Sequence, residues 1–446
     1  MNSKSALLIG LVLNLPIGYV FADEVKIGAA KMIAAGPTLS QPRAAFGGET
    51  YLVVWQDGWP GVDATADIRG MRLNANTLEP IDKEPLRLCT APDAQEAPAV
   101  AYADGVYCVV WQDFRSGKNY EVRGTLVDAK TGMVREKEIA IAVQAGNQVR
   151  PSVASDGKTF FVVWHETRGR DAFGIRGVRV SPTGEVLDKA PHDYAASGTS
   201  PSVSVSGGKV LVVWTNRDRN NAKTAAALVD PVSGQKAKDL GTINTCCGNA
   251  PVTAADGAGN FVAVASRASV PDPWGWGGPG AVVLSRVLAD GSTPESKLNY
   301  AYRLSNLCSR SVPNVVDAAV WKGSKTWDAG AVGGFPGTQD GLWPTGSPAV
   351  VHAGKDLFLL AWVKGTLGKD KLTVSNLDVL VRGMDAKSLA VRIADQKAAA
   401  AVDADETHPV LVNGPKGEVL LLYERLNTGD ARHIAARRIT VDASAR

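Results

Sequence analysis

The amino-acid sequence predicts an all-β chain that folds as a single β-propeller of seven four-stranded blades. Three observations favour this class: a β-prone motif that returns about every 50 residues, the 46 glycines and 24 prolines of a turn-rich chain, and the lack of an apolar period of about 3.6 residues. Units that repeat at this distance bury their faces against their neighbours. A blade of four short strands fits one such unit, whereas a helical solenoid does not.

The repeated motif is predicted to be the second strand of each blade. Four near-identical copies end in a tryptophan and cover 51–55, 107–111, 160–164 and 210–214. Weaker copies end at Ala265, Trp362 and Tyr423. Because β-branched and aromatic residues dominate these runs, each is expected to form a strand. The recurring tryptophan is expected to pack between neighbouring blades.

The third copy illustrates the expected blade. Pro151 opens a short first strand, Asp156 and Gly157 form a tight turn, and 160–164 is the second strand. A polar loop leads to 174–180, where alternating side chains predict a half-exposed third strand. A turn and a weaker fourth strand lead to the next unit. Prolines open the seven units at positions 42, 98, 151, 201, 251, 348 and 409.

One gap between opening prolines is nearly double the others, since 97 residues separate Pro251 from Pro348. An eighth blade or an insertion explains this gap. A faint further copy opens at Pro313, but only 35 residues separate it from Pro348, too few for four strands with their turns. We therefore expect an insertion at about 306–346, with eight blades as the alternative.

The two ends of the chain are expected to meet in one blade. The run 25–33 resembles a fourth strand, and 433–439 resembles a third strand. Pairing between them would close the ring and leave no free sheet edge.

The first 22 residues have the pattern of a secretory signal: a basic start at Lys4, an apolar run over 6–15, and small residues before Asp23. The chain is thus expected to be exported, to the periplasm or the extracellular space, with 23–446 as one propeller domain. No membrane span is expected, because no run approaches about 18 apolar residues. The 48 basic and 45 acidic residues are dispersed, which argues against a nucleic-acid partner.

Irregular sequence is concentrated in the loops between strands two and three and in the connections from strand four to the next blade. In a propeller these connections open on the same end, which we call the elaborated face; it comprises 58–61, 271–279 and the insertion. Its candidate ligand-binding tryptophans are Trp59, Trp274, Trp276, Trp327 and Trp343. Exposed tryptophans stack on sugar rings or anchor a protein partner, although they also pack on one another in long loops.

Polar residues recur two places beyond the blade aromatic. Asp113 with Arg115, and Glu166 with Arg168, follow the pattern Trp-x-acid-x-Arg. If these residues form a ring around the mouth of the central channel, the ring suits a polar ligand. The alternative is that each acid pairs with its own arginine. Asp113 and Arg115 are therefore further ligand-binding candidates. His165, Glu166 and Arg168 are the catalytic candidates, since a lyase or glycosidase acting on uronic acids requires a carboxylate-binding cation and a proton-transfer group.

Five cysteines in an exported chain predict a disulfide. Cys246 or Cys247 is expected to bridge Cys308 across the elaborated face, with a strained Cys246–Cys247 bridge as the alternative. Cys108 is expected to be a buried apolar residue. The sequence contains no metal-binding spacing and predicts no cofactor, with a structural calcium ion left as an alternative.

The repeat Pro-x-Val-Ala, Asp-Gly, Val-Val-Trp-x-Asp-x-Arg resembles a class of secreted bacterial propellers that usually have no assigned function. The resemblance covers most of 40–305 and, more weakly, 345–440. It implies the fold, and no catalytic motif of the polysaccharide-cleaving propellers has a residue-by-residue match. The expected function is extracellular binding of a carbohydrate or cell-surface glycan. The alternatives are a polysaccharide lyase or glycosidase acting at the same face, or a scaffold that binds a surface protein.

Overall fold

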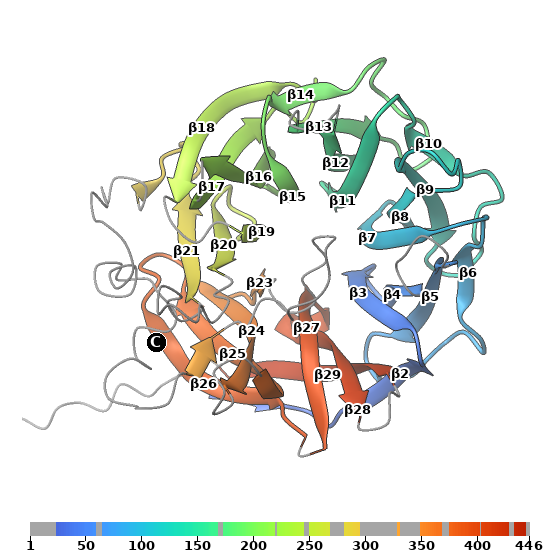
Figure 1. The fold of residues 1–446 in the computed structure, drawn as a ribbon. Helices are drawn as coiled ribbons and strands as arrows, with labels where there is room; N and C mark the ends of the chain where they lie inside the picture. Colours follow the sequence, from blue (N-terminus) through green and yellow to red (C-terminus); the bar gives the residue numbers. More distant parts are fainter. Residues whose placement is uncertain are drawn as a thin grey trace, which may run out of the picture.

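The computed structural model describes residues 24–58, 65–167, 173–218, 221–244, 249–267, 281–294, 328–330, 348–367, 374–401, 403–427 and 432–442. Their strands form seven antiparallel sheets, arranged as blades around a central axis (Figure 1). The prediction of a seven-bladed propeller is confirmed, and eight blades are excluded.

Blades one to four each contain four consecutive strands. Blade one is β3 (Leu39–Phe46), β4 (Thr50–Asp57), β5 (Asp67–Asn74) and β6 (Leu86–Cys89). Blade two is β7 (Gln95–Ala103), β8 (Val106–Asp113), β9 (Glu121–Asp128) and β10 (Ile139–Ala142). Blade three is β11 (Asn147–Ser155), β12 (Phe160–Thr167), β13 (Phe173–Val180) and β14 (His192–Ala195). Blade four is β15 (Thr199–Ser206), β16 (Lys209–Asp218), β17 (Asn221–Val229) and β18 (Lys236–Asn244).

The other three blades depart from this pattern. The described strands of blade five are β19 (Asn249–Ala255), β20 (Phe261–Arg267) and β21 (Ala281–Val287). Blade six is β23 (Ala349–His352), β24 (Leu357–Leu367), β25 (Val374–Asp385) and β26 (Val391–Ala399). Blade seven is β27 (Ala404–Asn413), β28 (Val419–Asn427) and β29 (Arg432–Asp442), with β1 (Glu24–Ile27) and β2 (Lys31–Gly36).

Blade seven closes the ring with strands from both ends of the chain. Val25 of β1 pairs with Val441 of β29, and Lys31 of β2 pairs with Ala436 of the same strand. The two short strands together occupy the place of a fourth strand, as the sequence predicts.

Part of the insertion joins blade six. The strand β22 (Asp328–Gly330) pairs with Lys364–Thr366 near the end of β24, and β23 pairs with an earlier part of β24. The rest of the expected insertion lies outside the described residues. The proposed signal segment also lies outside them.

The motif tryptophans lie in the second strand and are buried between blades. Trp55, Trp111, Trp164, Trp214 and Trp362 are between 0 and 3 % exposed. Trp111 of blade two belongs to a cluster with Leu52 and Val54 of blade one. Trp164 lies in the equivalent cluster between blades two and three, which also contains Cys108. The predicted packing role of both residue types is confirmed.

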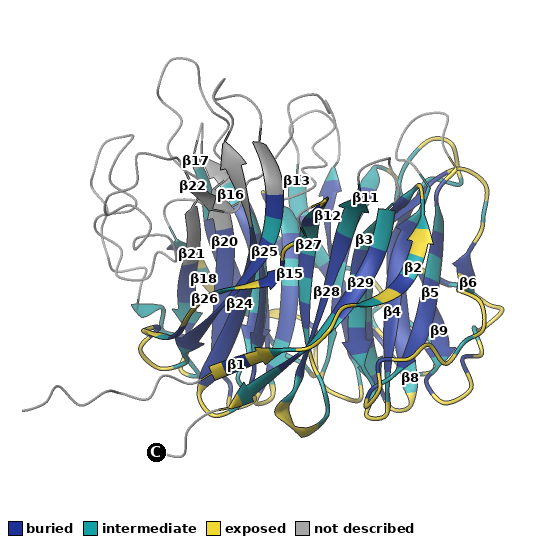
Figure 2. Cartoon of the chain, turned by 90° about the horizontal axis from the view of Figure 1, so that it is seen from below, coloured by how far each residue is buried: buried dark blue, intermediate teal, exposed yellow. Residues whose placement is uncertain are grey.

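The end opposite the elaborated face carries short hairpin turns, many of them exposed along the lower edge of Figure 2. Arginines connect neighbouring blades there. Arg72 of β5 forms an ion pair with Asp82 at 2.6 Å and donates hydrogen bonds to the carbonyls of Ala129 and Lys130 in blade two. The carbonyls of Ala129 and Lys130 are thus bonded within the protein, and these bonds connect this end of blade one to blade two. No helix among the described residues is long and apolar enough to cross a membrane.

Candidate functional site

The loops after strand two and the connections from strand four meet at one end of the ring. The N–H of Gln148, at the start of β11, donates to the carbonyl of Tyr120 in the loop between β8 and β9 at 2.9 Å. Gln95 makes the same bond to Ala66 in blade one at 2.7 Å. These repeated bonds show that the two loop types share a face, as expected for a propeller.

Each innermost strand except β23 contains, near its start, a bulge that the sequence does not reveal. The strands begin before the opening proline, and the residue preceding that proline has a left-handed backbone in six blades: Gln41, Ala97, Arg150, Ser200, Ala250 and His408, with φ between 40° and 54°. The pairing register shifts at each of these positions. A left-handed backbone is costly for a residue with a side chain, so another contact has to compensate for it.

The compensating contact comes from the preceding blade. The residue directly after the blade aromatic accepts a hydrogen bond from the N–H of the left-handed residue. The four recorded pairs are Arg150 to Gln112 (2.9 Å), Ser200 to His165 (3.4 Å), Ala250 to Thr215 (3.0 Å) and Gln41 to Glu424 (2.6 Å). These bonds join successive blades beside the axis and fix the inner rim of the elaborated face.

His165 is therefore an inter-blade acceptor. Its Nδ1 accepts from Ser200, and burial, with the positive charge of Arg150, lowers the pKa of His165 from 6.5 to about 4. The ring is thus neutral near pH 7 and suited to accepting this bond. Glu166 is 2 % exposed and lies 3.2 Å from Arg176, and Arg168 falls outside the described residues. These contacts place His165 in an inter-blade hydrogen bond and Glu166 in an ion pair with Arg176.

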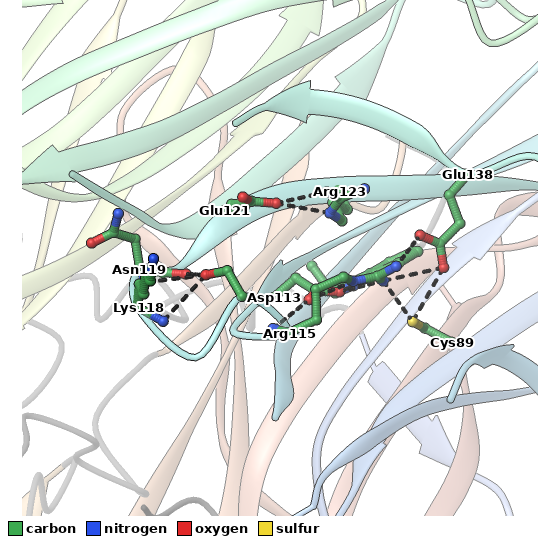
Figure 3. A network of polar contacts seen from close by, with 10 residues as sticks. Cys89, Asp113, Arg115, Lys118, Asn119, Glu121, Arg123 and Glu138 are labelled. Carbon is green, nitrogen blue, oxygen red and sulfur yellow. Dashed lines mark hydrogen bonds and ion pairs between the residues drawn. The ribbon is translucent and has the colours of Figure 1, made fainter. Parts of the chain in front are cut away.

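Asp113 and Arg115 are joined in a partly buried polar network (Figure 3). The carboxylate of Asp113 has no exposed surface; it accepts from Trp111 Nε1 at 2.8 Å and from Arg115 at 2.6 Å. Arg115 also pairs with Glu138 at 2.9 Å, and its guanidinium donates to the sulfur of Cys89 at 3.2 Å. Hydrogen bonding to Asp113 raises the pKa of Arg115, and burial raises the pKa of Cys89 to about 12. Pairing within the blade thus accounts for both charged residues.

The tryptophan candidates Trp59, Trp274, Trp276, Trp327 and Trp343 lie outside the described residues. The strands that flank them are described. Trp59 follows β4, and Trp274 and Trp276 lie between β20 and β21, so all three belong to connections between strands two and three. Trp327 directly precedes β22, and β22 pairs with the C-terminal end of β24. The connection between strands two and three of blade six begins at that end of β24.

The cysteine and metal predictions have different outcomes. Cys246, Cys247 and Cys308 lie outside the described residues, so the bridge remains a prediction. Cys89 and Cys108 are buried free thiols. Within the described part of the chain, no group of three or more His, Cys, Asp or Glu side chains is arranged to hold a metal ion.

The innermost strands carry a second set of residues that sequence reasoning did not single out. The residue after each opening proline is Arg43, Ala99, Ser152, Ser202, Val252, Ala349 or Val410. Ser152 shows where this position lies, since its hydroxyl accepts the N–H of Val203 on the next innermost strand at 3.3 Å. Alignment of the seven prolines would have shown that Arg43 is the one charged residue in this set.

No protein-family model matches the sequence, and a search of the curated proteins finds no match. Solved structures resemble the chain in fold. A protein of unknown function from Dyadobacter fermentans is 14 % identical, with a TM-score of 0.45 over 78 % of this chain and 94 % of its own. A sialidase from Trypanosoma rangeli is 10 % identical, with a TM-score of 0.46 over 90 % of this chain and 54 % of its own. An α-L-arabinofuranosidase from Clostridium thermocellum is 13 % identical, with a TM-score of 0.36 over 57 % of this chain and 92 % of its own. Identities this low carry no information on activity.

Proposed function

We propose that this protein is a carbohydrate-binding propeller that holds a saccharide at the elaborated face. The observation that carries the proposal is the difference between the two ends of the ring. The strand ends that flank the tryptophan-rich connections lie at one end, whereas short turns join the described strands at the other end, where Arg72 bonds to the turn of the next blade. Loops elaborated on one side of a rigid scaffold are the usual location of a binding site.

The inner rim supports this role because it is held rigidly. Hydrogen bonds between blades fix Arg150, Ser200 and Ala250, and the motif tryptophans fill the space between the sheets. A rigid base lowers the entropy cost of ordering loops around a ligand. Tryptophan supplies a large flat surface for the apolar face of a sugar ring. The proposal includes export of the chain, which would expose it to polysaccharide or to cell-surface glycans.

The test is a glycan-array screen of the mature chain, with released oligosaccharide assayed in the same wells. Trp274→Ala and Trp276→Ala should each weaken binding of an identified glycan by about 1–3 kcal/mol where the indole forms a stacking platform. Met133→Ala is the matched control, since Met133 is 66 % exposed in the turn between β9 and β10 at the other end.

Three results would contradict the proposal: no glycan binds, both tryptophan variants bind as well as the wild type, or Met133→Ala weakens binding equally. Release of oligosaccharide would replace binding with cleavage as the function. Retained binding to a surface protein in the absence of glycan would support the scaffold alternative instead.

A further inference from the structure

Arg43 differs from the residues that share its position in the ring. The innermost strands β3, β7, β11, β15, β19, β23 and β27 surround the axis in Figure 1. After their opening prolines, the other six blades carry alanine, serine or valine. Ser152 shows that this position lies at the edge between adjacent innermost strands. A long cationic side chain at Arg43 thus stands among six small neutral ones.

The guanidinium of Arg43 is poorly compensated by the protein. Among the described residues its one hydrogen bond is to the carbonyl of Pro42, at 2.8 Å, and no carboxylate lies within ion-pair distance. Burial lowers the pKa of Arg43, which the negative charge of Glu424 offsets in part. Arg43 is partly exposed, so a ligand can reach it. By contrast, Arg72 in β5 of the same blade is 5 % exposed and has both oxygens of Asp82 as partners. A partly buried cation with no carboxylate at ion-pair distance can take its counter-ion from a ligand.

Glu424, whose charge acts on Arg43, is already engaged. One of its oxygens accepts the N–H of Gln41 at 2.6 Å, and the other lies 3.1 Å from Nδ1 of His408. Gln41 is the left-handed residue two places before Arg43, and its side-chain amide makes no hydrogen bond to a described residue. Unused guanidinium donors and an unused amide therefore lie close together in sequence, at the start of β3 beside the elaborated face.

We infer that Arg43 is an anion-binding residue at the inner rim of the elaborated face, and that it takes the carboxylate of an acidic saccharide such as a uronic acid. The inference rests on the proposed function and names its ligand class. The planar guanidinium matches a carboxylate with two parallel hydrogen bonds, which a lysine ammonium does not reproduce. Gln41 is a second binding residue that offers one amide donor to the same ligand. A neutral saccharide would leave the charge of Arg43 uncompensated.

The test measures thermal unfolding of the mature chain with sodium galacturonate, galactose or sodium sulfate as probes. Galacturonate should raise the Tm of the wild type, and galactose should not. Arg43→Gln should remove the galacturonate effect, with affinity about tenfold or more weaker, and Arg43→Lys should retain part of it. Arg87→Gln is the matched control, because Arg87 is exposed on the outer strand β6, and it should respond as the wild type does.

The inference is overturned if Arg43→Gln keeps the full galacturonate effect, if no Tm shift occurs in the wild type, or if sulfate stabilises the protein and galacturonate does not. Arg43→Lys keeps the test valid if the glutamine variant fails to fold. The array separates this inference from the proposed function. Binding of neutral glycans alone would uphold the function and refute the role of Arg43. An Arg43-dependent galacturonate shift, together with glycan binding that Trp274→Ala and Trp276→Ala leave unchanged, would uphold the role of Arg43 and refute the tryptophan platforms.

Discussion

His165 shows how the neighbour of a side chain decides its chemistry. A histidine beside a glutamate in a loop region fits proton transfer, which is why the sequence favours it as a catalytic candidate. The partner of His165 is the N–H of Ser200, 35 residues away on the next blade. In other blades, Gln112 and Thr215 serve as the same acceptor. The shared role becomes evident only when the blades are placed side by side.

This role predicts a pH dependence of stability. The unfolded chain protonates His165 below its ordinary pKa of 6.5, whereas the native protein resists protonation until about pH 4. The free energy of unfolding should therefore fall as the pH is lowered across this window, by on the order of 3 kcal/mol. His165→Gln keeps an acceptor and removes the titration, so the fall should be smaller in that variant. Urea unfolding from pH 7 to pH 4 measures this, and parallel profiles for the two proteins would refute it.

For the charged candidates, burial distinguishes a ligand-binding ring from internal ion pairs, which the sequence cannot do. Asp113 and Arg115 follow the repeat pattern, and a pattern alone fits both a binding ring and a set of internal pairs. The contact with Trp111 Nε1 decides for internal pairing, since it uses an oxygen of a fully buried carboxylate. Arg43, by contrast, belongs to no motif, so the sequence did not single it out. It is distinctive only in comparison with the six equivalent positions.

At the scale of elements, the second strands were predictable and the first strands were not. The motif in β4, β8, β12 and β16 combines high β propensity with burial on both faces, so local sequence is sufficient. Prolines suggested where the first strands begin, yet all of these strands except β23 start two to five residues earlier. Proline disfavours an α-helical conformation in the preceding residue, but it does not reveal a left-handed one. That conformation depends on an acceptor in another blade.

The left-handed bulge predicts the effect of glycine at one site. Ala97 has a φ of 52°, so Ala97→Gly should relieve backbone strain and stabilise the protein by up to about 1 kcal/mol, whereas Ala97→Val should destabilise it. Ala101→Gly is the control, because Ala101 lies further along β7, is buried, and has no left-handed backbone. That change should destabilise the protein. Urea midpoints compare the three variants, and a loss of stability in Ala97→Gly would contradict the interpretation.

At the scale of the whole molecule, closure of the ring depends on β1 and β2. Removal of residues 23–36 should leave the outer edge of β29 unpaired and expose part of the interface between blades six and seven. We expect a markedly lower Tm and loss of a single cooperative transition. Calorimetry of the truncated and full chains provides the measurement. An unchanged Tm would show that these strands do not contribute to closure.

The bond between Gln41 and Glu424 spans 383 residues of sequence, whereas the equivalent bonds elsewhere span about 35–40. Loop-closure entropy rises with the logarithm of loop length, and this difference of about three doublings corresponds to roughly 2 kcal/mol. Joints between consecutive blades can therefore form early in folding, one after another. The contact between the first and last blades has to form when the intervening blades are already curved into an arc. We therefore expect the seam at Glu424 to form late in folding.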